Sequence, residues 1–423
     1  MDAKMAVSQS SMTSTTLETK LQAALRRRER VGTLRTLQTQ DDACIDFFSN
    51  DYLGFARSKE LQDRIHSRRE ELKTTKPRLM QVGSTGSRLI SGNHAFFTQV
   101  ESELAAFYGC EAALLFNSGY AANLGVLSSL PGASDVVLYD ELVHNSCHEG
   151  LRLSRAYANQ NTFAFQHNSL EHLEIQLKRL HEQQNSSPRC VFVVVESIYS
   201  MDGDVAPLTE MTALCERFGA YLIVDEAHGV GVYGPHGSGV VRELGLDQKS
   251  HVICCRVYTF GKAMGTHGAV VCGSQVLVDY LVNYARSFIY TTSCPVDQLV
   301  SIQCAHEYCA QADPQRSRVK ELVRYFKRSV EKSAEIPSAA LLQSDSPIQG
   351  VVFAGNHAVL DAAKQMRALG IRVIPIRSPT VPKGSERFRI IIHADNTEAE
   401  IDQLVHALVV LFRQASLVHK AKL

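Results

Sequence analysis

The sequence predicts an α/β protein whose large domain is built on a mostly parallel sheet, followed by a smaller α+β domain. Two observations predict this fold class. Between residues 46 and 290 short apolar runs alternate with segments of helical period, which is typical of a sheet covered by helices on both faces. From residue 291 the order changes to helix, strand, helix, two strands and a final helix. The length of 423 residues is sufficient for both domains.

The first 45 residues are expected to precede the large domain as a leader and an N-terminal helix. Residues 1–16 are polar and rich in Ser and Thr, which is typical of a flexible leader. A helix is expected from Leu17 to about Leu37, and its arginine run from Arg26 to Arg30 is typical of a solvated helix face.

The large domain, residues 46–290, contains apolar runs of the length of buried strands. The expected strands are Ala112–Phe116, Asp135–Tyr139, Cys190–Val195, Tyr221–Val224, His251–Val257 and Gly268–Gly273. Helices are expected between them, for example at His94–Tyr108, Ser169–Glu182 and Pro207–Phe218. Because a helical crossover returns the chain to the same edge of the sheet, this alternation predicts that neighbouring strands run parallel to each other.

The small domain, residues 291–423, is expected to begin with a long helix near Ser317–Lys332. The elements expected after it are Ile348–Ala354, Ala358–Leu369, Val373–Ile376 and Arg387–His393. The last helix should start near Thr397, because Thr397 and Glu400 have the spacing of a capping box.

Composition excludes several classes of protein. The chain has 44 basic and 44 acidic residues, which argues against broad binding to nucleic acid or to a membrane surface. No apolar run approaches the roughly 20 residues of a membrane-spanning helix. The eleven cysteines form no CxxC pair, so neither a metal centre nor a disulfide framework is expected. We expect a soluble protein with reduced cysteines.

Reactive or anion-binding residues follow five of the expected strands. In an open parallel sheet the carboxyl ends of the strands meet at one edge, where ligands bind. These segments are therefore expected to form one site: Asn117–Tyr120, His144, Ser200–Asp204, Asp225–His228 and Thr259–Lys262.

The residues of this site suit pyridoxal phosphate, which needs a lysine, a carboxylate for its ring nitrogen and donors for its phosphate. Lys262 is the candidate for the Schiff base, and Asp225 for the ring nitrogen. His228 could reach the phenolic oxygen of the ring. Gly119 and Tyr120 open a helix and offer backbone N–H groups to the phosphate.

A competing motif is the GxGxxG string from Gly229 to Gly234, which occurs in dinucleotide-binding folds. There, a helix opens at the glycines. In this sequence Pro235, Gly237 and Gly239 follow instead, so a dinucleotide site is disfavoured.

Four motifs resemble those of the α-oxoamine synthases, pyridoxal-phosphate enzymes of the aspartate aminotransferase-like fold (fold type I). They are Ser49–Gly54, Gly83–Arg88, Asp225–Gly229 and Thr259–Ala263, and the resemblance runs from about Leu25 to Leu411. It implies a homodimer with shared active sites that condenses an amino acid with an acyl-CoA and releases carbon dioxide.

The resemblance also implies a role for each matching residue. Lys262 would hold the cofactor and move protons, His144 would stack on its ring, and Asp225 would face the ring nitrogen. His228 and Ser200 would approach the phenolic oxygen. The implied phosphate ligands are Gly119, Tyr120, Thr259 and, from the second subunit, Thr291 or Thr292; Asn50 and Arg389 would bind the carboxylate of the amino acid.

The segment Ile376–Pro382 resembles the branch of the family that joins L-alanine to pimeloyl-CoA and makes 8-amino-7-oxononanoate for biotin. A pimeloyl chain ends in a second carboxylate, which a guanidinium can bind bidentately. Arg377 is the candidate for this contact, with Arg35 as its helper. The alternatives are a relative that uses another amino acid or a longer acyl-CoA, and a non-catalytic subunit, which the presence of Lys262 and Asp225 disfavours.

The C-terminal tripeptide Ala421-Lys422-Leu423 resembles the signal that addresses proteins to peroxisomes. We therefore expect recognition by a peroxisomal import receptor. A cytoplasmic protein is the alternative.

Overall fold

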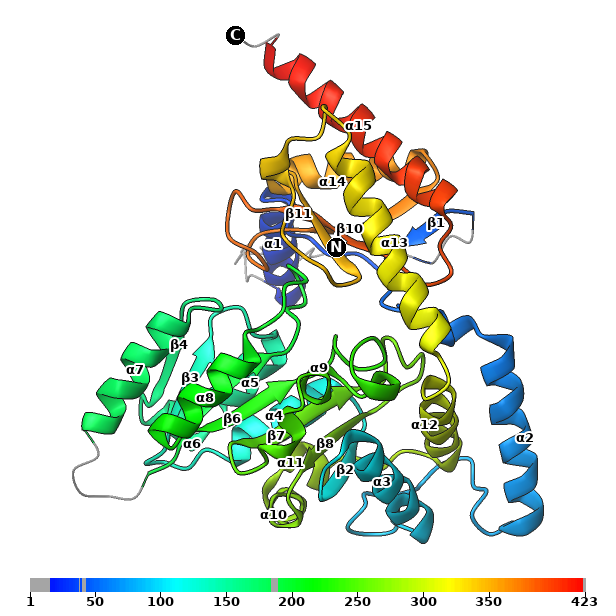
Figure 1. Cartoon of the computed structure of the whole chain (residues 1–423), viewed down its shortest axis with the longest axis vertical. Helices are drawn as coiled ribbons and strands as arrows, with labels where there is room; N and C mark the ends of the chain where they lie inside the picture. Colours follow the sequence, from blue (N-terminus) through cyan, green and yellow to red (C-terminus); the bar gives the residue numbers. More distant parts are fainter. Residues whose placement is uncertain (1–15, 38, 40–42, 184–188, 421–423) are drawn as a thin grey trace, which may run out of the picture.

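The structure is a computed structural model that describes residues 16–37, 39, 43–183 and 189–420, and it forms two lobes (Figure 1). In this part of the chain the larger lobe has a seven-stranded sheet and the smaller lobe a four-stranded sheet. The strands of the large sheet lie in the order β2 (Ala112–Phe116), β8 (Ala269–Gly273), β7 (Ile253–Thr259), β6 (Tyr221–Asp225), β5 (Val191–Glu196), β3 (Val136–Asp140) and β4 (Thr162–Phe165).

The large sheet is mostly parallel, which confirms the expected fold class. The neighbouring pairs from β4 to β7 are all parallel, and only β8 runs antiparallel to both of its neighbours. The six expected strands are present within two residues of their expected bounds. The sequence analysis missed β4, because this edge strand has only four residues and too short a pattern to be recognised.

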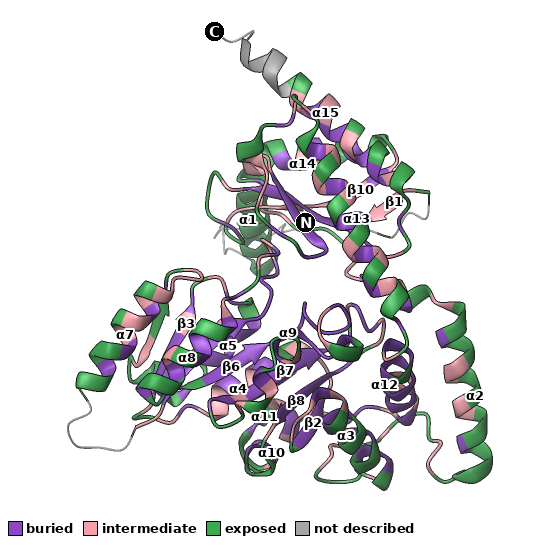
Figure 2. Cartoon of the chain, in the orientation of Figure 1, coloured by how far each residue is buried: buried purple, intermediate pink, exposed green. Residues whose placement is uncertain are grey.

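Side chains of the large sheet alternate between two hydrophobic clusters on opposite faces. In β5, Val193 and Val195 belong to one cluster and Phe192 and Val194 to the other. Burial on both faces explains why the strands read as continuous apolar runs, and Figure 2 shows them buried between helices with exposed outer faces. Helices contributing to the first cluster are α3 (Ala95–Tyr108), α7 (Leu170–Glu182), α8 (Leu208–Phe218) and α12 (Val296–Cys309); those contributing to the second are α4 (Gly119–Ser129), α5 (Asn145–Arg152) and α10 (Gln275–Tyr284).

The small sheet has the order β1 (Ile45–Phe47), β10 (Ile371–Ile376), β11 (Arg387–Ile391) and β9 (Ile348–Val352). Its helices are α1 (Leu17–Arg30), α13 (Asp313–Glu331), α14 (Asn356–Ala368) and α15 (Glu398–Lys420). The capping box before α15 is confirmed: Thr397 N donates to Glu400 Oε2 at 2.8 Å, and Glu400 N donates to Thr397 Oγ1 at 3.2 Å.

The two sheets divide the chain differently from the expected boundaries at 45/46 and 290/291. Strand β1 precedes the large lobe but pairs with β10, and α12 packs on α2 (Lys59–Thr75) and α3 of the large lobe. The small lobe therefore combines the N-terminal segment with the chain from α13 onward. Helix α1 ends at Arg30 and not at Leu37, because Gly32 adopts a left-handed conformation (φ +67°). The expected leader lies outside the described residues, except for Thr16, which caps α1.

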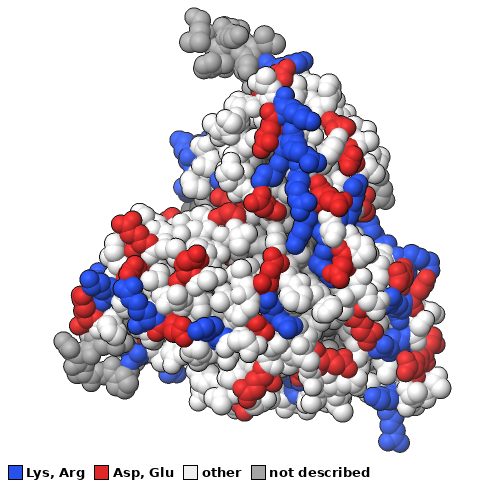
Figure 3. Space-filling model, in the orientation of Figure 1, with Lys and Arg blue, Asp and Glu red and all other residues white. Residues whose placement is uncertain are grey.

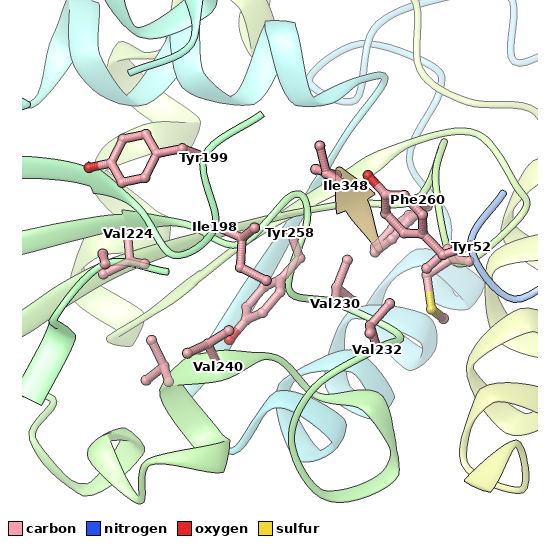
Figure 4. Packing of buried hydrophobic residues seen from close by; sticks show 14 of the residues in the cluster. Tyr52, Ile198, Tyr199, Val224, Val230, Val232, Val240, Tyr258, Phe260 and Ile348 are labelled. Carbon is pink, nitrogen blue, oxygen red and sulfur yellow. The ribbon is translucent and has the colours of Figure 1, made fainter. Parts of the chain in front are cut away.

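One hydrophobic cluster continues from the large lobe into the small lobe. It contains Phe260, which follows β7, Tyr52 from the loop after β1, and Ile348 at the start of β9 (Figure 4). Because interiors pack closely, this shared core holds the two lobes in one arrangement around the space between them.

Basic side chains gather over α13 on the face shown in Figure 3, interspersed with acidic ones. Lys327 forms an ion pair with Asp345, and Arg318 lies 3.8 Å from Glu398. Neighbouring acids thus partly neutralise this surface. None of the helices in the described ranges combines the length and the apolar character needed to cross a bilayer.

Candidate active site

A cavity of about 260 Å³ opens at the carboxyl ends of the central strands of the large sheet. The parallel order of β3, β5, β6 and β7 brings the segments that follow them to this edge, as the sequence predicted. The cavity is lined by Asn50, Ser118, Gly119, Tyr120, Asn123, His144, Ser146, Glu196, Asp225, Ala227, His228, Thr259, Gly261, Lys262, His267 and Gly268.

Lys262 stands on the loop after β7 and lines the cavity. Burial lowers the pKa of Lys262 to about 8, against the opposing pull of Asp225 and Glu196. The loop packs closely on the glycine turn after β6, where a Cβ on Gly231 would lie 2.6 Å from Ala263 Cβ. The GxGxxG string thus forms a turn without side chains, against which the loop that carries Lys262 can pack. Residues 235–237 after it form a 3₁₀ turn.

Asp225 ends β6 and is 5% exposed. Asn123 Nδ2 donates to Asp225 Oδ2 at 2.6 Å, and Ala227 N donates to Oδ1 at 2.9 Å. Both donors orient the carboxylate. Since a buried carboxylate needs such partners or a cation, the site is suited to a protonated ring nitrogen.

His144 caps the N-terminus of α5 and connects to Asp225 through a polar chain. Its Nδ1 lies 2.7 Å from Ser146 Oγ, which in turn accepts from Asn123 Nδ2 at 3.0 Å. Burial lowers the pKa of His144, although Asp225 acts in the opposite direction. The result is a neutral, oriented imidazole that can stack on a planar ring.

His228 is buried, and its Nδ1 lies 2.6 Å from Tyr52 Oη. Burial, together with the cations Lys262 and Arg389, holds the pKa of His228 well below its ordinary value. Burial raises the pKa of Tyr52 to about 12, so the phenol keeps its proton. Donation from Tyr52 to Nδ1 leaves Nε2 as the N–H of the ring, a neutral donor for an oxygen in the cavity.

The opposite end of the cavity is suited to an anion. Gly119 is the first residue of α4, and a Cβ there would lie 2.2 Å from Thr259 Cγ2, so only glycine allows this approach. Thr259 Oγ1 is buried and has no hydrogen-bond partner in the described structure. Backbone N–H groups at a helix start and an unpartnered hydroxyl together fit a phosphate.

The residues present therefore fit pyridoxal phosphate: an amine, a carboxylate for the ring nitrogen, an imidazole for the ring face and a phosphate cradle. When bound, this cofactor supplies an electron sink for charge left on the substrate.

Asn50 and Arg389 are brought together, with Arg389 Nη1 donating to Asn50 Oδ1 at 2.9 Å. Arg389 is buried, which lowers its pKa, and no carboxylate in the described chain forms an ion pair with it. A buried guanidinium beside a cavity-lining amide suits the carboxylate of an amino acid.

Three predicted cofactor residues lie outside this cavity. Thr291 Oγ1 and Thr292 O accept hydrogen bonds from Asn117 Nδ2 at 3.1 and 2.8 Å, and neither threonine lines the cavity of its own chain. Their role in a second subunit stays a prediction. Ser200 N donates to Glu196 Oε2 at 3.2 Å, and Ser200 lines an adjacent cavity.

The adjacent cavity, of about 910 Å³, shares His144 with the first and extends towards the small lobe. Its wall includes Arg35 from the segment after α1 and residues 379–382 from the small lobe. Arg377 does not line it. Instead, Arg377 Nη1 donates to Gly32 O at 2.8 Å and to Leu34 O at 2.9 Å, which fixes the segment that carries Arg35.

Ion pairs hold the loop after β5, which forms another wall of this second cavity. His167 lies between Asp140 (Nδ1 to Oδ1, 3.0 Å) and Asp204 (Nε2 to Oδ2, 2.8 Å). Burial alone would lower the pKa of His167, but these hydrogen bonds raise it to about 10. Asp202, on the same loop, pairs with Arg387 of β11 and so connects the two lobes.

The sequence analysis missed several residues of the site. Glu196 ends β5 and pairs with Asp225 in the parallel register, and its position at a strand end was the signal that could have found it. Burial raises the pKa of Glu196 well above its ordinary value. Asn123 and Ser146 left no such signal, because only the packing of α4 on α5 joins them. The described residues contain no group of side chains that could hold a metal ion, and all eleven cysteines are free.

Comparison with known proteins identifies the family. Residues 42–408 match the family Aminotransferase class I and II. The 8-amino-7-oxononanoate synthase of Emericella nidulans is 38% identical over 407 residues, which cover 93% of this chain and 95% of that protein. The solved structure of serine palmitoyltransferase from Sphingomonas wittichii has a TM-score of 0.81 at 25% identity and covers 95% of this chain and 99% of its own. The solved structure of 8-amino-7-oxononanoate synthase from Francisella tularensis has a TM-score of 0.69 at 25% identity, and the match covers 90% of this chain and 100% of that one.

Fold and site thus define a pyridoxal-phosphate enzyme of fold type I. The chain belongs to the aminotransferase class I and II family and, within it, to the α-oxoamine synthases, which are acyltransferases.

Proposed function

We propose that the enzyme condenses L-alanine with pimeloyl-CoA to give 8-amino-7-oxononanoate, CoA and carbon dioxide, a step of biotin biosynthesis. The observation that supports this choice of acyl donor is the second cavity, which shares His144 with the first cavity and is lined by Arg35, a cation with no ion pair among the described residues. The relatives named 8-amino-7-oxononanoate synthase support the same assignment.

Arg35 at the second cavity suits the distal carboxylate of a pimeloyl chain. Arg35 is exposed and forms no ion pair within the described chain. The cavity wall also contains Glu141, which accepts from His167 N, and Asp202, which pairs with Arg387. Because neither carboxylate forms an ion pair with Arg35 among the described residues, this guanidinium is available to an anionic ligand.

The pKa of Arg377 is lowered mainly by burial of Arg377 and, to a smaller extent, by the positive charge of Arg35. In this arrangement Arg35 binds the ligand, and Arg377 positions the segment that carries Arg35. The sequence analysis expected the opposite, with Arg377 as the ligand-binding residue and Arg35 as its helper.

The residues of the first cavity account for the proton transfers of this reaction. Lys262 Nζ, with a pKa near neutrality, can remove the proton at Cα of the amino acid and later return one. Asn123 and Ala227 hold the Asp225 carboxylate in place, where it would pair with the ring nitrogen of the bound cofactor. Arg389 and Asn50 hold the carboxylate of the amino acid until it leaves as carbon dioxide.

Product analysis tests this proposal. The purified enzyme would be supplied with alanine, glycine or serine in combination with pimeloyl-CoA or palmitoyl-CoA. We expect 8-amino-7-oxononanoate from alanine and pimeloyl-CoA to form fastest. A preference for serine and palmitoyl-CoA would instead favour the activity named for the serine palmitoyltransferase neighbours.

We further propose a homodimer in which Thr291 or Thr292 of one subunit reaches the phosphate of the other. Their position outside the cavity of their own chain supports this proposal. Mixing inactive Lys262→Ala subunits with inactive Thr291→Ala/Thr292→Ala subunits should restore part of the activity, because one of the two sites in a mixed dimer is then intact.

The tripeptide Ala421-Lys422-Leu423 supports import into peroxisomes, although it lies outside the described residues. A tagged chain without Leu423 should remain in the cytoplasm. If it localises like the full-length chain, this proposal is wrong.

A further inference from the structure

We propose that His267, on the loop between β7 and β8, is an additional ligand of the cofactor phosphate. It lies outside the motifs that carry the family resemblance, and it is one of the residues that line the first cavity. The inference requires only the cofactor and does not depend on which acyl donor the enzyme uses.

The register of the sheet places His267 at the phosphate end. Ala269 in β8 pairs with Phe116 of β2 on one side and with Thr259 of β7 on the other. His267, two residues before Ala269, therefore lies just beyond both strands, where the N-terminus of α4 and the end of β7 meet. These two elements supply the phosphate cradle described above.

The backbone around His267 is fixed by hydrogen bonds. Phe260 N donates to Gly268 O at 2.9 Å, and Thr266 N donates to Phe260 O at 3.0 Å. Gln298 Nε2 donates to Thr266 Oγ1 at 3.0 Å and also to His267 O. The imidazole, in contrast, is exposed and makes no hydrogen bond to the described residues, so its donor is available to a ligand.

Charge explains why such a ligand is needed. A phosphate monoester is an anion, but the α4 N–H groups and Thr259 Oγ1 are neutral donors. Among the described residues that line the cavity, Lys262 is the only Lys or Arg, and it serves the aldehyde end of the cofactor. His267 is the remaining basic side chain of the described lining at the phosphate end, and a hydrogen bond that it donates to an ionised phosphate is of the stronger, charge-assisted kind.

The test compares pyridoxal phosphate with pyridoxal, which lacks the phosphate. The holoenzyme and its H267A and H267N variants would be freed of cofactor by dialysis against cysteine, then titrated with each compound by visible absorbance. We expect both variants to bind pyridoxal phosphate roughly 10- to 100-fold more weakly, the cost of one charge-assisted hydrogen bond. Their affinity for pyridoxal should be unchanged. H251N is the matched control, because His251 is an exposed histidine paired with Glu216 far from the cavity.

Two results would overturn the proposal. Unchanged affinity for pyridoxal phosphate in both variants would show that His267 does not contact the phosphate, and a loosened dimer in sedimentation would then assign it to the subunit interface. An equal loss for pyridoxal phosphate and pyridoxal would show that the substitution perturbs the whole site and that the phosphate is not its target.

Discussion

The two cavities of this enzyme are built in different ways. The cofactor cavity is formed by short loops that directly follow buried strands, and its residues Asp225 and His228 are themselves buried. The second cavity is formed by an exposed segment after α1, a loop held by ion pairs and a segment of the small lobe. The residues that fit the cofactor thus stand at the ends of the rigid sheet, whereas the cavity proposed for the acyl chain is formed by segments that come from both lobes.

The largest effect is expected at the floor of the cofactor cavity. Lys262→Ala removes the amine that holds the cofactor and moves protons, so turnover should fall by at least about 10³-fold, within the range of lost acid–base catalysis. The visible absorbance of the lysine-linked cofactor should disappear as well. Lys364→Ala, on the surface of α14, is the control. Turnover of alanine at the native rate would disprove the assignment of Lys262.

Asp225→Asn should have the next largest effect. The amide keeps the size of the side chain but removes the charge opposite the ring nitrogen, and turnover should fall by roughly 10²- to 10³-fold, as for loss of one preorganised electrostatic group. The cofactor should still be attached, with a shifted absorbance maximum. A variant with native turnover and an unshifted spectrum would show that Asp225 does not face the ring.

A smaller and more selective effect is expected in the second cavity. Arg35→Leu should raise KM for pimeloyl-CoA by roughly tenfold, because one charged hydrogen-bonding group is lost, and should leave palmitoyl-CoA unaffected. Arg377→Leu should act in the same direction but more weakly, since Arg377 works through the segment of Arg35. Steady-state kinetics with both donors checks this. The distal-carboxylate proposal fails if neither variant discriminates between them.

The smallest effect concerns stability and pH. The pKa of His167 rises from its ordinary value of 6.5 to about 10 on folding, so its stabilising contribution is complete below pH 6.5 and is lost as the pH rises towards 10. His167→Gln should lower the free energy of unfolding by about 1 kcal/mol at pH 7. Urea unfolding should show this difference shrinking by pH 10. A difference that is the same at both pH values would mean that packing, and not charge, accounts for it.

Much of the fold could be predicted because each central strand is buried on both faces and therefore reads as an apolar run. The motifs at Asp225, Lys262 and Gly119 could be assigned for the same reason, since each follows such a strand directly. Strand β1 could not be placed in the small sheet, because three residues carry too little pattern to specify a partner more than 300 residues away. Asn123 was missed because its proximity to Asp225 arises only from helix packing, whereas Glu196 stands at a strand end and could have been found by the same reasoning as Asp225.

The sequence by itself determined the class of enzyme and its cofactor, because the reactive residues are local features of strand ends that any parallel sheet brings to one edge. Only the tertiary structure decided which arginine lines the second cavity, which sheet contains β1 and that His267 lines the first cavity. These are contacts between segments far apart in the chain, and only the packing of the two lobes and the pairing of the strands specify them.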